Sequence, residues 1–182
     1  MTNHSIFYSE FIVGVNKINQ SLESFEVDLM SDDYSHKDFL KNSFIVLLCS
    51  LGENYFRIRF EDYIDTKNQI LKNAQIKSAL IKYTTKKEYP KDNSAIDQIF
   101  QLGFPMDEVS LSFQKIKKYY IMVGINLDIE RSLVDSIEEL IEKRNSYAHK
   151  QVNANCTVLD IKRYLQSLEK FIIICDNQFP EY

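Results

Sequence analysis

The sequence predicts an all-α fold built as one helical bundle, and three observations lead to it. Apolar residues recur at spacings of three and four along most of the chain, which is the period of an amphipathic helix. Only 4 glycines and 3 prolines are available, too few for the many tight turns of an all-β domain. Because 45% of the 182 residues are hydrophobic, a single domain spanning residues 1–182 is expected to bury an adequate core.

Two helices are predicted in the N-terminal third. The first spans residues 6–29, and the second spans residues 37–64 after a polar loop at residues 28–36. The second helix is apolar on two faces. One face has Leu40, Phe44, Leu47, Leu48, Leu51, Tyr55 and Ile58, and the opposite face has Ile45, Cys49, Phe56 and Phe60. Such a helix lies either at the centre of a bundle or between the core and a partner subunit.

The middle of the chain, residues 67–91, is rich in lysine. A helix is predicted over residues 68–85, and Tyr89-Pro90 ends it. The lysines of the segment are Lys67, Lys72, Lys77, Lys82, Lys86, Lys87 and Lys91. A solvated lysine face is the simpler interpretation, and a patch that guides RNA is the alternative.

Further helices are predicted toward the C-terminus. A short one spans residues 94–102, and another is capped by Asp107 and continues to residue 123. Asp128 is the predicted N-cap of the helix that follows. The last helix starts after Thr157, where Thr-Val-Leu-Asp resembles a capping box.

The helix after Asp128 carries the residues from which a catalytic site can be argued. Its apolar stripe consists of Leu133, Ile137, Leu140, Ile141 and Ala148. At about 100° per residue, Arg144 falls within this stripe. A guanidinium keeps its charge at neutral pH, so Arg144 needs an anionic partner or contact with water there. Asn145 and His149 are four residues apart and therefore neighbours on the helix surface, turned about 100–140° from Arg144.

This combination of side chains suits a phosphodiester. The arginine offers a positive fork to phosphoryl oxygens, Asn145 can hold the ring of His149 in one tautomer, and that ring can exchange a proton near neutral pH. Lys143 and Lys150, beside the motif, are candidate RNA-binding residues. The simpler interpretation pairs Arg144 with a carboxylate on another helix and lets His149 cap a frayed helix end, because Arg-x4-His alone is a weak pattern.

Glu53 is the acidic residue that the sequence singles out. It lies within the second apolar face of the long helix, and buried glutamates are uncommon unless they are paired. Two interpretations stay open. Either Glu53 is a charged residue at a solvent-exposed end of the helix, or it pairs with Arg144 or hydrogen-bonds to His149.

The residues around the motif resemble the HEPN superfamily, small helical bundles whose nuclease members carry Arg-x(4–6)-His with a polar residue directly after the arginine. Residues 144–149, Arg-Asn-Ser-Tyr-Ala-His, fit this pattern, including the Arg-Asn start and Ala-His finish common in the toxin and phage-defence branches. Residues 44–55, an apolar run with Glu53 near its end, resemble the second helix of these proteins. Residues 113–125 and 133–141 resemble their C-terminal half.

The resemblance implies a metal-independent endoribonuclease that uses no cofactor. In it His149 is the acid–base group, and Arg144 stabilises charge on the phosphoryl oxygens. Asn145 orients the histidine or binds phosphate, and Glu53 sets the position of Arg144 or His149. A homodimer with a composite active site is expected, because one motif histidine per chain is few for a reaction that needs both a proton acceptor and a proton donor.

The expected biological role is that of a toxin or an anti-phage defence effector, with an antitoxin or regulatory protein as a further partner. Some toxins of the superfamily carry a tyrosine two residues after the histidine, which a partner nucleotidyltransferase modifies. Lys150 and Gln151 follow the histidine here, so that type of pairing is in doubt. The alternative is a non-catalytic HEPN module for dimerisation or for binding nucleotides or RNA.

Charge and cysteine content limit the other function classes. The formal net charge is −4, so any RNA contact must use a local basic patch. The 3 cysteines are widely spaced and give neither a disulfide framework nor metal-ligand spacing, so no metal site is predicted. Neither a signal peptide nor an apolar segment of membrane-spanning length is recognisable, so a cytoplasmic location without a membrane partner is expected.

Overall fold

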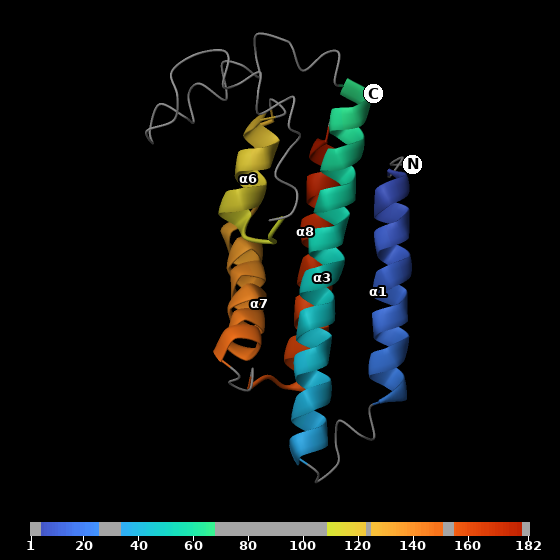
Figure 1. Cartoon of the computed structure of the whole chain (residues 1–182), viewed down its shortest axis with the longest axis vertical. Helices are drawn as coiled ribbons and strands as arrows, with labels where there is room; N and C mark the ends of the chain where they lie inside the picture. The colour runs from blue at the N-terminus through green and yellow to red at the C-terminus, as the bar shows by residue number, and fades with distance from the viewer. Residues whose placement is uncertain (1–4, 26–33, 68–108, 123–124, 151–154, 180–182) are drawn as a thin grey trace.

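The structure, a computed structural model, describes residues 5–25, 34–67, 109–122, 125–150 and 155–179. In these ranges the chain is all-α and has no strand, which confirms the predicted fold class. The helices are α1 (Ile6–Ser24), α3 (Tyr34–Lys67), α6 (Phe113–Met122), α7 (Arg131–Lys150) and α8 (Val158–Gln178) (Figure 1). None of these helices combines the length and the apolar character that crossing a bilayer requires.

Helix α3 is the axis of the bundle. Its 34 residues extend over about 50 Å at 1.5 Å per residue, and it packs against α1, α7 and α8. Helix α7 packs in addition against α6 and α8. Figure 1 shows that α3 and α7 run in opposite directions, because the chain enters α3 at the end of the bundle where it leaves α7. The long second helix therefore lies at the centre of the bundle, one of the two positions predicted for it.

The two predicted faces of α3 are buried to different extents. The second face is buried completely and consists of Ile45, Cys49, Phe56 and Phe60. On the first face Leu48 and Tyr55 are buried, but Leu47 is 50% exposed, so this face is only partly buried within the chain. The reason is that α1 covers only one flank of α3, and the surface of α3 between α1 and α7 is left uncovered by the described helices (Figure 1).

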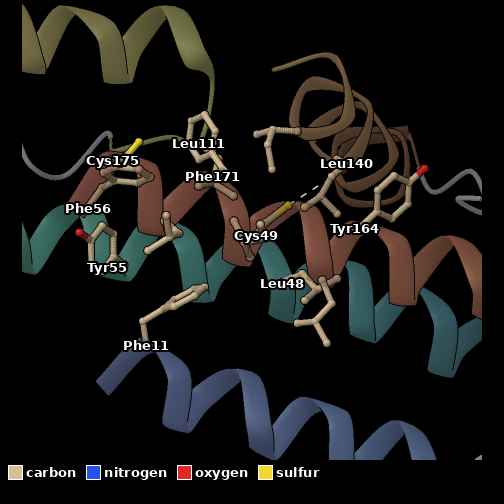
Figure 2. Packing of buried hydrophobic residues seen from close by; sticks show 14 of the residues in the cluster. Phe11, Leu48, Cys49, Tyr55, Phe56, Leu111, Leu140, Tyr164, Phe171 and Cys175 are labelled. Atoms are coloured by element: carbon tan, nitrogen blue, oxygen red, sulfur yellow. Dashed lines mark hydrogen bonds between the residues drawn. The ribbon is translucent and has the colours of Figure 1, made fainter. Parts of the chain in front are cut away.

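Close packing joins α1 to α3 and α3 to α8. A Cβ added at Gly14 of α1 would lie 2.5 Å from Cδ1 of Leu51, so a larger residue at this position would force the Leu51 side chain to move. Aromatic rings then run through the core, with Phe11 5.9 Å from Tyr55 and Phe56 6.0 Å from Phe171 (Figure 2). Each edge-to-face pair of this kind adds about 0.5–1.5 kcal/mol to the burial of apolar area.

The start of α8 agrees with the predicted capping box. Thr157 is the N-cap, and its Oγ1 accepts a hydrogen bond from the Asp160 backbone N–H at 3.1 Å. In return, Oδ2 of Asp160 accepts from the Thr157 backbone N–H at 2.8 Å. The backbone N–H and the hydroxyl of Thr157 both donate to this carboxylate, which stabilises its ionised form and lowers the pKa of Asp160.

The predicted start of the motif helix is wrong. Helix α7 begins at Arg131, and Asp128 is held outside it by two bonds to the end of α8. The Asp128 backbone N–H donates to Oε1 of Gln178 at 3.2 Å, and Nε2 of Gln178 donates to the Asp128 carbonyl at 2.9 Å. Helix α1 also ends before the predicted residue 29, and α3 begins before the predicted residue 37.

Several predictions fall outside the described residues. They are the helices over residues 68–85 and 94–102 and the lysine-rich segment 67–91 apart from the backbone of Lys67. Asp107 itself also lies outside the described residues, but the helix predicted to follow it begins only at Phe113, because residues 109–112 are not helical, so the predicted start of that helix is wrong. The organisation of residues 1–182 as one domain also stays a prediction.

Candidate functional site

The candidate site forms where α7 crosses the middle of α3. Nη2 of Arg144, on α7, donates to Oε1 of Glu53, on α3, at 2.6 Å, and each of the two side chains is 23% exposed. The pairing of Glu53 with Arg144 is one of the two arrangements that the sequence left open for Glu53. It also fits the simpler interpretation of Arg144, which asks only for a carboxylate on another helix. The geometry alone therefore does not separate a catalytic from a structural arginine.

The surroundings of Glu53 disfavour its charge in spite of this ion pair. Burial raises the pKa of Glu53, while Arg144, the backbone amide of Leu111 and the charge of Lys115 lower it in part. The close approach of Leu111 depends on Gly52, where an added Cβ would lie 2.6 Å from Cδ2 of Leu111. The segment before α6 can thus close over α3 beside the glutamate, which explains both its burial and its backbone hydrogen bond.

Arg144 continues the buried stripe of α7, as its position in the sequence predicts. Ile137 and Leu140 are fully buried on that stripe, two turns and one turn before Arg144 respectively. Nε of Arg144 is also buried and has no hydrogen-bond partner among the residues that the structure describes. Arg144 is therefore buried at Nε, while its side chain as a whole is 23% exposed.

Asn145 lies on a different side of α7. With Ser146 it lines a hollow of about 490 Å³. The other lining residues, apart from Ile141, are the carboxylates Asp135, Glu138, Glu139 and Glu142. Phosphate groups are repelled by such a surface, so this hollow is unsuited to bind a nucleic acid.

The carboxylates of the hollow were not singled out as functional from the sequence, although they recur at helical spacing on the polar face of the motif helix. Three of them have structural partners. Glu138 accepts from the Phe113 backbone N–H at 2.8 Å and so caps α6, and Asp135 pairs with Arg131 at 2.9 Å. Glu139 accepts from Arg163 at 3.0 Å and from the Tyr164 hydroxyl at 2.8 Å, which ties α7 to α8.

His149 and Lys150 belong to the last turn of α7, but their side chains lie outside the described part of the structure. The backbone continues as a helix from Asn145 to His149, so the two positions are one turn apart, as predicted. Lys143 is partly buried, and its Nζ donates to the Asn155 carbonyl at 3.4 Å. Lys143 therefore has a hydrogen bond within the chain, which its predicted role in RNA binding does not require.

Among the described residues there is no group of three or more His, Cys, Asp or Glu side chains arranged to hold a metal ion. Cys49, Cys156 and Cys175 are free and buried. Burial raises the pKa of each of these thiols, which makes all three unreactive at neutral pH.

Comparison with protein-family models identifies the family to which this chain belongs. A family model described as RiboL-PSP-HEPN matches residues 15–181. The chain belongs to the RiboL-PSP-HEPN family. Comparisons with the curated proteins and with the solved structures found no match.

Membership in the RiboL-PSP-HEPN family confirms the HEPN resemblance that the motif predicted. The matched range includes both Glu53 and the Arg144–His149 motif, so the candidate site belongs to the HEPN domain itself. HEPN domains include ribonucleases and nucleotide-binding modules, and membership is compatible with either function. The roles of Arg144, Asn145, His149 and Glu53 in chemistry stay predictions.

Proposed function

We propose that this HEPN protein is a metal-independent endoribonuclease. The observation that carries the proposal is the ion pair of Arg144 with Glu53, which holds a guanidinium near the surface on the helix that also carries His149. An ion pair of this kind fixes the direction of the arginine fork, and a fixed fork is better suited than a mobile lysine to bind the oxygens of a phosphoryl group.

In the proposed reaction, an RNA 2′-hydroxyl attacks the adjacent phosphorus. A new O2′–P bond forms and the P–O5′ bond breaks, which leaves a 2′,3′-cyclic phosphate and a free 5′-hydroxyl. One histidine accepts the proton of the 2′-hydroxyl, and a second acid gives a proton to the departing 5′-oxygen. Arg144 stabilises the charge that develops on the two non-bridging oxygens, Asn145 orients His149 or binds phosphate, and Glu53 positions Arg144.

The proposed enzyme is a homodimer in which two copies of His149 supply the proton acceptor and the proton donor. Support comes from the uncovered surface of α3 between α1 and α7, where Phe39 is 59% and Leu47 50% exposed. Two large apolar side chains on the helix that carries Glu53 are suited to contact a second copy. Such an interface would lie on the same helix as Glu53, and we propose that it brings two motifs into one cleft.

The biological role that we propose is that of a toxin or an anti-phage defence effector, restrained by an antitoxin or another regulatory protein. Its substrate is RNA and it acts in the cytoplasm. Lys143 and Lys150, on either side of the motif, are proposed to contact the RNA backbone.

One observation favours a second function. The hollow beside Asn145 is lined by four carboxylates, which is unsuited to a nucleic acid and suited to a basic protein partner. In that case the protein is a non-catalytic HEPN module, and Arg144 serves assembly or stability alone. The two functions differ in one measurable property, because only the first makes RNA cleavage depend on His149.

The test is cleavage of a labelled RNA in EDTA by the purified wild type and by His149→Ala and Arg144→Ala. Loss of acid–base catalysis is expected to lower the rate by about 10²–10⁴ in His149→Ala. Arg131→Ala is the matched control, because Arg131 lies on the same helix in an exposed ion pair with Asp135, about 20 Å along the axis from Arg144. The control is expected to cut as fast as the wild type. Equal background cleavage by all four preparations, or equal cleavage of DNA of the same sequence, would refute the proposal.

A further inference from the structure

The order of the contacts between α3 and α7 shows the path that the side chain of Arg144 follows. Cys49 and Glu53 are one turn apart on α3, as are Leu140 and Arg144 on α7. In two antiparallel helices, the earlier residue on one helix faces the later residue on the other (Figure 1). Here the contacts run in the reverse order, because Sγ of Cys49 lies 4.0 Å from the Leu140 carbonyl (Figure 2) and Arg144 bonds to Glu53.

Arg144 must therefore extend past Cys49 to reach Glu53. Helical side chains lean toward the N-terminus of their own helix, which for α7 is the direction of Glu53 along α3. Nε of Arg144 is buried and, within the described ranges, has no hydrogen-bond partner, while Cys49 is 1% exposed. The guanidinium and the thiol also affect each other electrostatically, since Arg144 opposes the rise that burial causes in the pKa of Cys49.

We propose that Cys49 is a positioning residue for Arg144, a role that rests on the proposed ribonuclease function. The large, polarisable sulfur forms the surface against which the inner edge of the guanidinium packs. Glu53 holds one Nη atom one turn further along α3. Two contacts on neighbouring turns of one rigid helix fix both the position and the rotation of the Arg144 guanidinium, whereas the contact with Glu53 alone would leave the guanidinium free to rotate.

Other roles of Cys49 are excluded by its surroundings. Burial raises the pKa of the thiol to about 12, so it carries no thiolate at neutral pH and cannot act as a nucleophile. Its side chain is nearly inaccessible, which also protects it from oxidants. The remaining role for the Cys49 thiol is a buried polar contact with Arg144 and with the backbone of α7.

The experiment compares Cys49→Ala and Cys49→Ser with Cys175→Ala. Cys175 is the matched control, since it is fully buried in α8 and has no contact with Arg144 among the described residues. In Cys49→Ala, kcat for RNA cleavage is expected to fall on the order of tenfold with little change in KM, because Arg144 acts in the transition state. Cys49→Ser keeps a polar atom beside Nε and is expected to recover most of the loss, while Cys175→Ala keeps the wild-type kcat.

A second readout does not depend on catalysis. Hydrogen exchange of the Arg144 Nε–H, followed by NMR, is expected to be faster in Cys49→Ala than in the wild type and unchanged in Cys175→Ala. Unchanged exchange in Cys49→Ala overturns the proposal, and so does an equal loss of kcat in Cys175→Ala. If the wild type cleaves no RNA, the proposed function fails by itself, and the exchange rates alone then decide whether Cys49 positions Arg144.

Discussion

Replacing Arg144 by methionine removes the charge and the hydrogen bonds of the ion pair but keeps most of the side-chain volume in the apolar stripe of α7. Two opposite charges about 4 Å apart at a partly solvent-exposed site attract each other by about 4 kcal/mol. The raised pKa of Glu53 shows that burial of the carboxylate outweighs this attraction, so the net contribution is smaller. A hydrogen bond to a charged group contributes about 1.5–3 kcal/mol, and we expect Arg144→Met to lower the free energy of unfolding by about 2 kcal/mol at pH 7.

The expected loss depends on pH, and its sign follows from Glu53. Arg144 lowers the pKa of Glu53, so without the arginine this pKa rises further above its usual value of 4.5. The folded variant then keeps a proton that the unfolded chain releases, and its stability falls as the pH rises from about 4.5 through the folded pKa. The wild type shows the same fall over a narrower range. The difference between the two proteins is therefore expected to be small at pH 4 and largest near neutral pH.

Urea unfolding followed by circular dichroism between pH 4 and pH 8 measures this difference. A loss of about 2 kcal/mol corresponds to a drop in Tm of about 4–8 °C for a chain of this size. Arg57→Met is the control, because Arg57 pairs with Glu61 at 3.1 Å with both side chains more than 40% exposed, and a surface pair contributes about 0–1 kcal/mol. If Arg144→Met loses no more stability than the control, or loses as much at pH 4 as at pH 7, the reasoning about a half-buried pair is wrong.

Three further predictions concern the core and the uncovered surface of α3. Tyr55→Phe removes a 2.7 Å hydrogen bond to the buried carboxylate of Asp176 and is expected to cost about 2 kcal/mol in denaturant unfolding. Tyr120→Phe, whose hydroxyl donates to the neutral Cys175 carbonyl at 2.8 Å, is expected to cost about half as much. Burial raises the pKa of both tyrosines well above 10.0, so the unfolded chain releases these protons first and stability is expected to fall above about pH 10. The slope is about 1.4 kcal/mol per pH unit for each tyrosine and is shallower in either phenylalanine variant. Leu47→Asp is expected to halve the mass measured by light scattering without unfolding the chain, whereas Val13→Asp, at an equally exposed position on α1, leaves the mass unchanged.

The features that were predicted correctly from the sequence depend on residues close together in the chain. The periodicity of α3 and the capping box at Thr157 involve neighbours within one or two turns, and local patterns report them directly. The pairing of Arg144 with Glu53 is not local. It was one of the interpretations left open for Glu53, because each charge interrupts an apolar stripe and a buried charge needs a partner. The sequence did not choose between them, because the choice depends on how the two helices cross.

The features that were missed depend on contacts between distant segments. Asp128 has the residue type of an N-cap, yet its bonds to Gln178 hold it outside the helix. Glu138 caps α6 from another helix, and no pattern within residues 107–123 announces a cap of that origin. Leu47 is exposed because the course of α1 leaves part of α3 uncovered, which the periodicity of α3 does not reveal.

The central claim is that Arg144 and His149 act on the same phosphodiester, and a double-mutant cycle on the rate of RNA cleavage tests it most directly. The wild type, Arg144→Ala, His149→Ala and the double variant are compared in single-turnover reactions in EDTA. Residues that serve one chemical step are strongly non-additive, so the double variant is expected to cleave about as slowly as the slower single variant, with each single loss about 10²-fold or more. Single variants that retain wild-type rates, or losses that multiply fully in the double variant, would contradict a shared site.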